Sequence, residues 1–154
     1  MTSLLDQNFP TDVIDRYSIS DRSLILPGLW LSAEPRELPN DVRVMISCSG
    51  LCRLPQVYDH VLKIYTYFED SDVLPPIELL YDLADAINMF RKTRSVLVHC
   101  VAGLNRSGLV MGLALVRSGE YTPIEALNLM REKRYPEVLY NPTFRRFLID
   151  GSHR

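Results

Sequence analysis

The chain lacks any excess of one charge and any long apolar run. Its 154 residues include 17 lysines and arginines against 19 aspartates and glutamates, which gives a net charge of −2. Such a balance provides no general electrostatic attraction for nucleic acid or for an anionic membrane surface. The apolar runs fall well short of the roughly 18 residues that a membrane-spanning helix needs. We therefore expect neither a nucleic acid nor a membrane among its partners.

Cysteine is scarce as well, because Cys48, Cys52 and Cys100 are the three in the chain. An odd, unevenly spaced set does not build a disulfide scaffold, so a reduced setting fits better. The first thirty residues carry four aspartates and no apolar run, from which we expect no signal peptide. These features together favour a cytoplasmic protein.

The chain contains no internal repeat, low-complexity tract or linker, and its length suits one domain over residues 1–154. Apolar and β-branched patterns predict strands that alternate with helices, which favours a mostly parallel sheet with helices on both faces. The expected strands are Arg22 to Ser32, with a turn at its Pro-Gly, and then Val42 to Ser49, His60 to Phe68 and Ser95 to Cys100. The expected helices run from Pro76 to Lys92, from Asn105 to a stop at Gly119, from Thr122 to about Arg134, and from Asn141 onward.

The segment HCVAGLNRSG, residues 99–108, combines a thiol with an arginine six residues later. Cys100 ends a short apolar strand, and the loop after it leads into a helix. Unpaired N–H groups at that helix start, with the flexible Gly103, suit a tetrahedral anion, and the Arg106 guanidinium offers a fork for two phosphate oxygens. The same positive field favours ionisation of the Cys100 thiol near neutral pH. The pattern predicts a bound phosphate with a nucleophile beneath it.

Other polar residues have simpler interpretations. Cys48, Cys52, His60 and His99 do not have the spacing of a tetrahedral zinc site, so we expect no metal. Asn141 is accounted for as the residue that begins a helix. The cluster of Arg131, Lys133 and Arg134 is typical of a solvated helix face.

The segment HCVAGLNRSG resembles the His-Cys-x5-Arg-Ser/Thr signature of cysteine-based protein phosphatases, specifically the compact dual-specificity type. The segments LPGLWLSAEP, YFEDSDVLPP and VLYNPTFRRFL are similar to that family's opening strand, general-acid segment and closing helix. The resemblance implies an α/β fold with a central, mostly parallel sheet of four to five strands flanked by helices. It also implies hydrolysis of phosphomonoesters through a phosphocysteine, with no cofactor.

The resemblance also implies roles for individual residues. Cys100 is the expected nucleophile. Ser107 matches the hydroxyl that hydrogen-bonds the departing thiolate, and its alternative role is that of an ordinary residue at a helix start. His99 matches an orienting histidine, or else is a packed strand residue. The phosphate-binding residues are expected to be Val101, Ala102, Gly103, Leu104, Asn105 and Arg106.

The leaving group needs a proton, and three acids lie in the region where the family places its general acid. Asp70, just past the end of a predicted strand, matches the family best. Asp72 and Glu69 are the alternatives, and all three could instead be solvated loop acids.

The expected activity is that of a protein phosphatase, in a monomer that acts on phosphotyrosine and phosphoserine/threonine in phosphorylated protein substrates. A chain of this length has little room for a deep phosphotyrosine pocket. The alternatives are a phosphoinositide phosphatase, disfavoured because the loop lacks lysines, and an RNA 5′-triphosphatase, which has a second histidine where Ala102 stands. A catalytically weak phospho-binding module is the alternative of a different class, although Cys100, Arg106 and Asp70 are all present.

Cys48 is a candidate redox partner of Cys100. It lies near the C-terminal end of a predicted strand, and that end meets the end of the Cys100 strand if the two strands are parallel. Some lipid-directed relatives in the family place a resolving cysteine there. Cys52 is a second candidate partner, and the simplest alternative is that Cys48 is a small buried residue.

Overall fold

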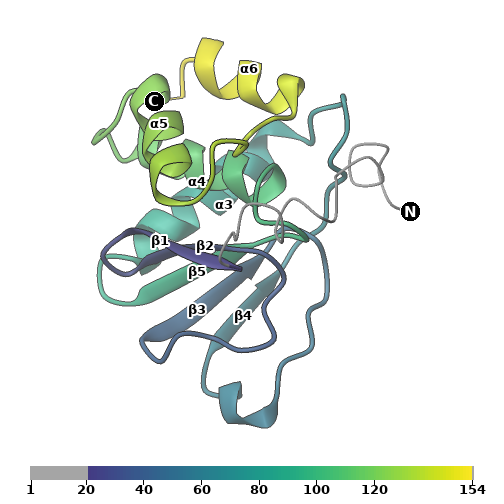
Figure 1. Ribbon diagram of the computed structural model, residues 1–154, viewed down its shortest axis with the longest axis vertical. Coiled ribbons are helices and arrows are strands. Elements are labelled where there is room, and N and C mark those ends of the chain that lie inside the picture. Colours follow the sequence, from purple (N-terminus) through teal and green to yellow (C-terminus); the bar gives the residue numbers. More distant parts are fainter. Residues whose placement is uncertain (1–20, 154) are drawn as a thin grey trace.

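The computed structural model of the chain describes residues 21–153, and Figure 1 shows their arrangement. The first twenty residues, on which most of the signal-peptide expectation rests, lie outside this part. The strands are β1 (Arg22–Leu26), β2 (Leu29–Ser32), β3 (Val42–Ser47), β4 (Leu62–Tyr65) and β5 (Ser95–His99). The helices are α3 (Ile77–Phe90), α4 (Arg106–Arg117), α5 (Pro123–Lys133) and α6 (Pro142–Asp150), with a 3-10 turn η1 (Gln56–Tyr58).

The five strands form one sheet in the order β1-β2-β5-β3-β4. The pairs β2–β5, β5–β3 and β3–β4 are parallel, whereas β1 and β2 form an antiparallel hairpin. The hairpin turns at Gly28, whose φ of 75° is one that glycine adopts without strain. The prediction of a mostly parallel sheet of four to five strands within an α/β fold is confirmed.

Two strands are shorter than the sequence predicts. The residues Thr66 and Tyr67 leave the parallel ladder, because Tyr67 forms an isolated antiparallel bridge with Ser49. Gly50 lies beside this bridge with a φ of 91°, and its N–H donates to the Thr66 carbonyl at 2.8 Å. The chain therefore leaves the sheet at residues whose β-branched and aromatic side chains still favour a strand.

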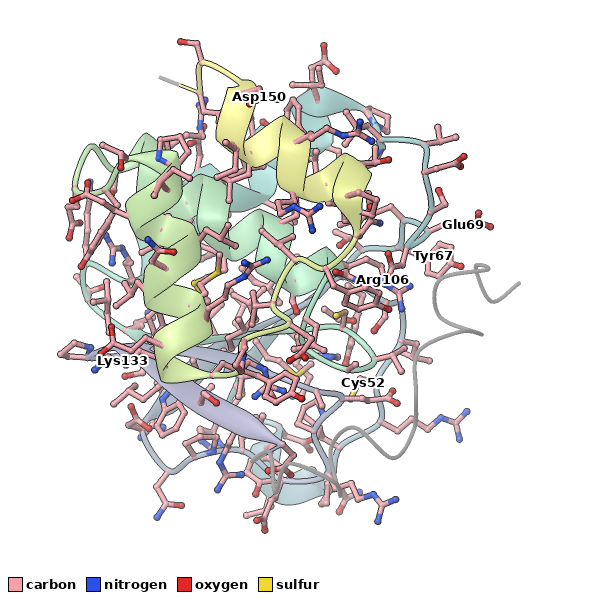
Figure 2. The ribbon with its side chains drawn as sticks, turned by 45° about the horizontal axis from the view of Figure 1, so that its top comes forward. Cys52, Tyr67, Glu69, Arg106, Lys133 and Asp150 are labelled. Carbon is pink, nitrogen blue, oxygen red and sulfur yellow. The ribbon has the colours of Figure 1, made fainter. Side chains whose placement is uncertain are left out.

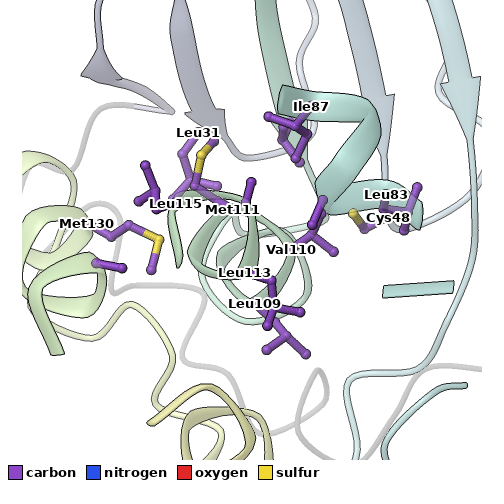
Figure 3. Close-up of a cluster of buried hydrophobic side chains, with 14 of the residues drawn as sticks. Leu31, Cys48, Leu83, Ile87, Leu109, Val110, Met111, Leu113, Leu115 and Met130 are labelled. Carbon is purple, nitrogen blue, oxygen red and sulfur yellow. The ribbon is translucent and has the colours of Figure 1, made fainter. Parts of the chain in front are cut away.

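Helix α4 is the centre of the larger core and is apolar nearly all round. It contacts α3, α5 and α6 as well as β2 and β5. Figure 3 looks along α4 and shows Leu109 and Leu113 pointing outward on one side of the helix and Val110 on another. A helix enclosed in this way holds its first turn rigidly at the edge of the sheet.

The two faces of the sheet are covered differently. Alternate residues of β5 point to opposite sides, so Val96 and Val98 join the larger core while Leu97 joins a smaller one with Met45 and Cys52. In the described residues, the smaller core is closed by Leu38 from a loop and Tyr58 from the 3-10 turn η1, among others, rather than by an α-helix. We expected helices on both faces of the sheet, but within residues 21–153 the α-helices cover one face.

The helix starts follow the expected chemistry with one correction. In α5, Thr122 Oγ1 accepts from the Glu125 N–H at 3.2 Å, while Glu125 Oε1 accepts from the Thr122 N–H at 2.9 Å, and together these bonds form a capping box. Pro76, predicted in the first turn of its helix, instead precedes Ile77 as the N-cap residue of α3. Among the described helices, none is both long and apolar enough to cross a membrane.

Candidate active site

The strand ends bring the motif to one edge of the sheet. His99 ends β5 and pairs in register with Ser32 of β2 on one side and Ser47 of β3 on the other. Cys100 follows directly, and residues 101–105 form the loop before α4 begins at Arg106. A ligand at the carboxyl ends of parallel strands is the usual arrangement in α/β sheets.

Gly103 is required where this loop touches β2. Its φ is 71°, and a Cβ added there would lie 2.4 Å from the carbonyl carbon and oxygen of Ser32. No side chain fits at that separation, and the positive φ disfavours other residues independently. The loop can therefore pack against the end of β2 because residue 103 has no side chain.

The Cys100 thiol lies at the base of the loop, and its residue is 3% exposed. Its Sγ is 3.1 Å from Ser107 Oγ, a hydrogen-bonding distance for a thiol and a hydroxyl. Arg106, buried in the first turn of α4, donates from Nη1 to the Phe68 carbonyl at 3.3 Å. Figure 2 labels Arg106 and also Tyr67 and Glu69, which flank Phe68 in the sequence. The structure thus brings the three predicted residues Cys100, Arg106 and Ser107 together.

Asp70 is buried and connects the predicted acid segment to the loop. Its Oδ2 accepts from Asn105 Nδ2 at 3.0 Å, and its Oδ1 accepts from Asn141 Nδ2 at 2.7 Å. The two asparagines are also joined, because Asn105 Oδ1 accepts from the Asn141 N–H at 3.0 Å. Glu69 and Asp72 are exposed. Of the three acids, Asp70 is the one held against the phosphate loop.

Asn141 does more than the sequence indicates. Its Oδ1 accepts from the N–H groups of Thr143 and Phe144, as expected for the residue that begins α6. Its Nδ2 donates to Asp70 and also to the Ser71 carbonyl at 2.9 Å. One amide thus caps a helix and fixes the acid segment, so the explanation of Asn141 as an N-cap alone is incomplete.

Arg134 contradicts its predicted place on a solvated helix face. It is 8% exposed, and its guanidinium donates to loop carbonyls, from Nε to Gly103 at 2.8 Å and from Nη2 to Ala102 at 3.0 Å. Its position is informative, because Arg134 is the C-cap residue of α5 and an arginine at a helix end can reach the carbonyls of a neighbouring loop. The charge pattern alone does not distinguish such a buried arginine from a solvated one.

His99 is buried behind the nucleophile. Its Nδ1 lies 3.2 Å from the Cys100 carbonyl, which accepts the proton of the neutral tautomer. Its Nε2 has no hydrogen-bond partner within residues 21–153. Burial lowers the pKa of His99 from 6.5 to about 4, although the bond to the Cys100 carbonyl acts in the opposite direction. The imidazole is therefore neutral at physiological pH.

This buried imidazole predicts a loss of stability in acid. In the unfolded chain His99 binds its proton near pH 6.5, whereas the folded chain binds it near pH 4. As the pH falls from 6.5 to 4, protonation therefore stabilises the unfolded state relative to the folded state. The contribution reaches about 3 kcal/mol below pH 4 and is absent above pH 6.5. Denaturant unfolding from pH 7 to 4 should show a smaller fall in stability for His99→Gln than for the wild type. The exposed His60, as His60→Gln, is the control, and equal falls in all three proteins would contradict the prediction.

The cysteines occupy two separate cores. Cys48 belongs to the larger core with Cys100, and its N–H donates to the His99 carbonyl at 2.8 Å. Burial raises the pKa of the Cys48 thiol, and the negative charge of an ionised Cys100 raises it further. Cys52 lies in the smaller core on the other face of the sheet, with its Sγ 3.6 Å from the Pro35 carbonyl. All three cysteines are free.

Because Cys48 shares the larger core with Cys100 and Cys52 does not, we expect a disulfide between Cys48 and Cys100. Peroxide converts the Cys100 thiolate to a sulfenic acid, and attack by the Cys48 thiol forms the S–S bond and releases water. We expect peptide mapping after mild peroxide to join Cys48 to Cys100, with activity restored by a thiol reductant. Cys52→Ser should behave as the wild type, whereas Cys48→Ser should lose the recovery. A bridge from Cys100 to Cys52, or Cys100 found solely as sulfinic acid, would contradict the assignment.

The residues considered for zinc do not converge. Cys48 and Cys52 lie in different cores, and His60 is exposed. Within residues 21–153, no three or more histidine, cysteine, aspartate or glutamate side chains are grouped to hold a metal ion.

A thiol beneath a loop that opens a buried helix, with a hydroxyl and an arginine beside it, defines the class of cysteine-based phosphatase domains. The family model "Dual specificity phosphatase, catalytic domain" matches residues 32–153. The chain belongs to this family, as its resemblance implies.

Curated relatives carry the same class of description. The chain is 26% identical over 125 residues to a tyrosine-protein phosphatase CDC14 homolog of Schizosaccharomyces pombe, covering 72% of this chain and 23% of that protein. It is 25% identical over 100 residues to protein tyrosine phosphatase PRL-1 of Trypanosoma cruzi, covering 61% of this chain and 56% of that protein. The chain thus spans less than two thirds of the length of these relatives.

Solved structures agree on the fold. A mouse putative dual specificity phosphatase complexed with zinc tungstate superposes with a TM-score of 0.72 at 19% identity, covering 83% of this chain and 84% of that one. Human DUSP28 gives a TM-score of 0.72 at 20% identity, covering 84% and 90%. At these identities the similarity establishes the architecture of the domain.

Proposed function

We propose that the chain is a protein phosphatase that hydrolyses phosphotyrosine and phosphoserine/threonine through a phosphocysteine on Cys100. The observation that carries the proposal is the 3.1 Å approach of Cys100 Sγ to Ser107 Oγ beside the buried Arg106. A thiol needs positive groups around it to act as a nucleophile, and Arg106 with the start of α4 supplies them.

In the first step, the Cys100 thiolate attacks phosphorus and the ester oxygen departs. The equatorial oxygens bear the developing charge, which the loop N–H groups and the Arg106 guanidinium stabilise. Asp70 is the proposed donor of the proton that the departing oxygen takes, and its amide contacts with Asn105 and Asn141 support its closeness to the loop.

In the second step, water attacks the phosphocysteine and the sulfur departs as a thiolate. Asp70, now deprotonated, takes a proton from the attacking water. The Ser107 hydroxyl donates a hydrogen bond to the departing sulfur, which lowers the cost of its negative charge. Phosphate is released, and every proton is accounted for without a metal ion.

The rim of the site favours protein substrates over inositol lipids. Val101, Tyr67 and Val73 are each more than half exposed, at 54%, 51% and 70%. Residues 101–105 carry no lysine or arginine that would bind further phosphates of a lipid headgroup. Exposed apolar side chains on the phosphate loop and on the acid segment suit the residues that flank a phosphoamino acid. The proposal extends to a monomer in the cytoplasm, and the three free cysteines support a reducing compartment.

The test is hydrolysis of para-nitrophenyl phosphate by the purified chain, measured with and without a chelator and, in a separate assay without chelator, with and without orthovanadate. The proposal requires turnover that the chelator leaves unchanged and vanadate inhibits. A panel of phosphotyrosine peptide, phosphoserine/threonine peptide, phosphoinositide and 5′-triphosphate RNA then identifies the substrate class. Preference for the lipid or the RNA would overturn the substrate assignment, and binding of a phosphopeptide without turnover would indicate a phospho-binding module.

A further inference from the structure

Four successive carbonyl groups of the phosphate loop are held by donors outside the loop. The Val101 carbonyl accepts from the Glu34 N–H at 3.1 Å, and the Leu104 carbonyl accepts from the Leu139 N–H at 3.0 Å. The two carbonyls between them, those of residues 102 and 103, accept from the Arg134 guanidinium. Main-chain N–H groups therefore hold the outer two carbonyls, and one side chain, that of Arg134, holds the inner two.

The direction of a carbonyl determines the direction of the next N–H. A trans peptide is planar, with its C=O and N–H pointing to opposite sides, and the described residues contain no cis peptide. Holding the Ala102 and Gly103 carbonyls against Arg134 therefore turns the N–H groups of Gly103 and Leu104 away from it. Loop N–H groups are the donors that the reaction needs for the equatorial oxygens of the phosphate.

Arg134 is built for this position. A planar guanidinium can bind two neighbouring carbonyls at once, which the single ammonium of lysine does less well. The residue is buried and also contacts the chain at and just before the start of β1: Nη1 donates to Ser23 Oγ at 3.2 Å and Nη2 to the Asp21 carbonyl at 3.4 Å. These contacts help to fix the orientation of the guanidinium.

We propose that Arg134 is a positioning residue that holds the Gly103 and Leu104 N–H groups toward the substrate phosphate. The inference rests on the proposed function and adds a residue from a separate helix, 28 positions after Arg106 in the chain. Arg106 contacts the substrate oxygens, whereas Arg134 acts through the backbone behind them.

The charge of Arg134 contributes in the same direction. Burial lowers the pKa of Arg134 to about 10, and the negative charges of Cys100 and Asp21 oppose that shift, so the guanidinium remains protonated at neutral pH. Arg134 thus adds a second cation to the field at the nucleophile.

The test is Arg134→Met, which keeps the length of the side chain and removes its donors and charge. We expect kcat/KM for para-nitrophenyl phosphate to fall about 10²-fold, the usual effect of losing an oxyanion donor, with kcat falling more than KM rises. Tungstate affinity measured by calorimetry should weaken as well. Arg134→Lys, which retains the charge and can reach one carbonyl, should recover part of both losses.

Lys133→Met is the matched control, because it removes a cation from an exposed position next to Arg134 and leaves the two loop carbonyls bound. It should keep kcat/KM and tungstate affinity unchanged. A folded Arg134→Met with kcat/KM and tungstate affinity of the wild type would overturn the proposal, as would an Arg134→Lys of full activity if the Met variant does not fold. A wild type that binds tungstate without turnover would refute the proposed function alone, and the tungstate affinities would still decide the role of Arg134.

Discussion

Cys100→Ser is expected to abolish turnover while leaving the binding of phosphate mimics largely intact. A serine hydroxyl in this place is a far weaker nucleophile than a thiolate, so we expect para-nitrophenyl phosphate hydrolysis to fall by at least about 10⁴-fold. The groups that hold the oxyanion remain, because Arg106 and the loop backbone are untouched. Steady-state kinetics and tungstate calorimetry measure the two properties separately.

Cys52→Ser is the control for this variant, because Cys52 is also buried but lies in the smaller core on the other face of the sheet. It should keep both turnover and tungstate binding. A fall in turnover of much less than about 10⁴-fold in Cys100→Ser would contradict the assignment of the nucleophile. Loss of tungstate binding in a folded Cys100→Ser would contradict the separation of binding from chemistry.

Asp70→Asn is expected to lower kcat by about 10²- to 10⁴-fold, the range typical of a lost general acid. The loss should be largest for a phosphoserine peptide, because an alkoxide needs the proton most, and smallest for a nitrophenolate. The ratio of the two losses within one variant is the informative quantity. A fall in the folded fraction reduces both rates equally and cancels in that ratio.

The ratio of losses is needed because Asp70 also stabilises the fold. Both carboxylate oxygens accept amide protons, from Asn105 and from Asn141. In Asp70→Asn one of these acceptors becomes an N–H donor facing another donor, which destabilises the fold by about 1–3 kcal/mol. Asp72→Asn, at an exposed position of the same segment, is the control and should leave the ratio unchanged. If Asp72→Asn shows the dependence on leaving group instead, the acid is Asp72.

The sequence predicts the parts of the site that are contiguous in the chain. Cys100, Arg106 and Ser107 lie on one strand–loop–helix segment, so their spacing and the apolar strand before them define the geometry directly. Ser107 Oγ lies within hydrogen-bonding distance of Cys100 Sγ because the loop turns into the first turn of α4. Local rules of strand ends and helix starts are sufficient there.

The supporting contacts come from residues remote in the chain, and single-sequence reasoning does not pair them. Asn141 reaches Asp70 across 71 positions, and Arg134 reaches the Gly103 carbonyl across 31. Each has a local explanation, as a helix start and as a charged helix end, that conceals its second role. Their significance depends on how α5 and α6 pack around α4, which composition and periodicity do not specify.

The central claim is that Cys100 carries the phosphate during turnover, and trapping the intermediate tests it most directly. Asp70→Asn, in which the second step lacks its base, is mixed with para-nitrophenyl phosphate and quenched rapidly in acid, and its peptides are examined by mass spectrometry. The account predicts one phosphate group on the peptide that contains Cys100, absent from the quenched Cys100→Ser variant. Turnover of the substrate with no phosphate on that peptide, or with phosphate on another residue, would contradict it.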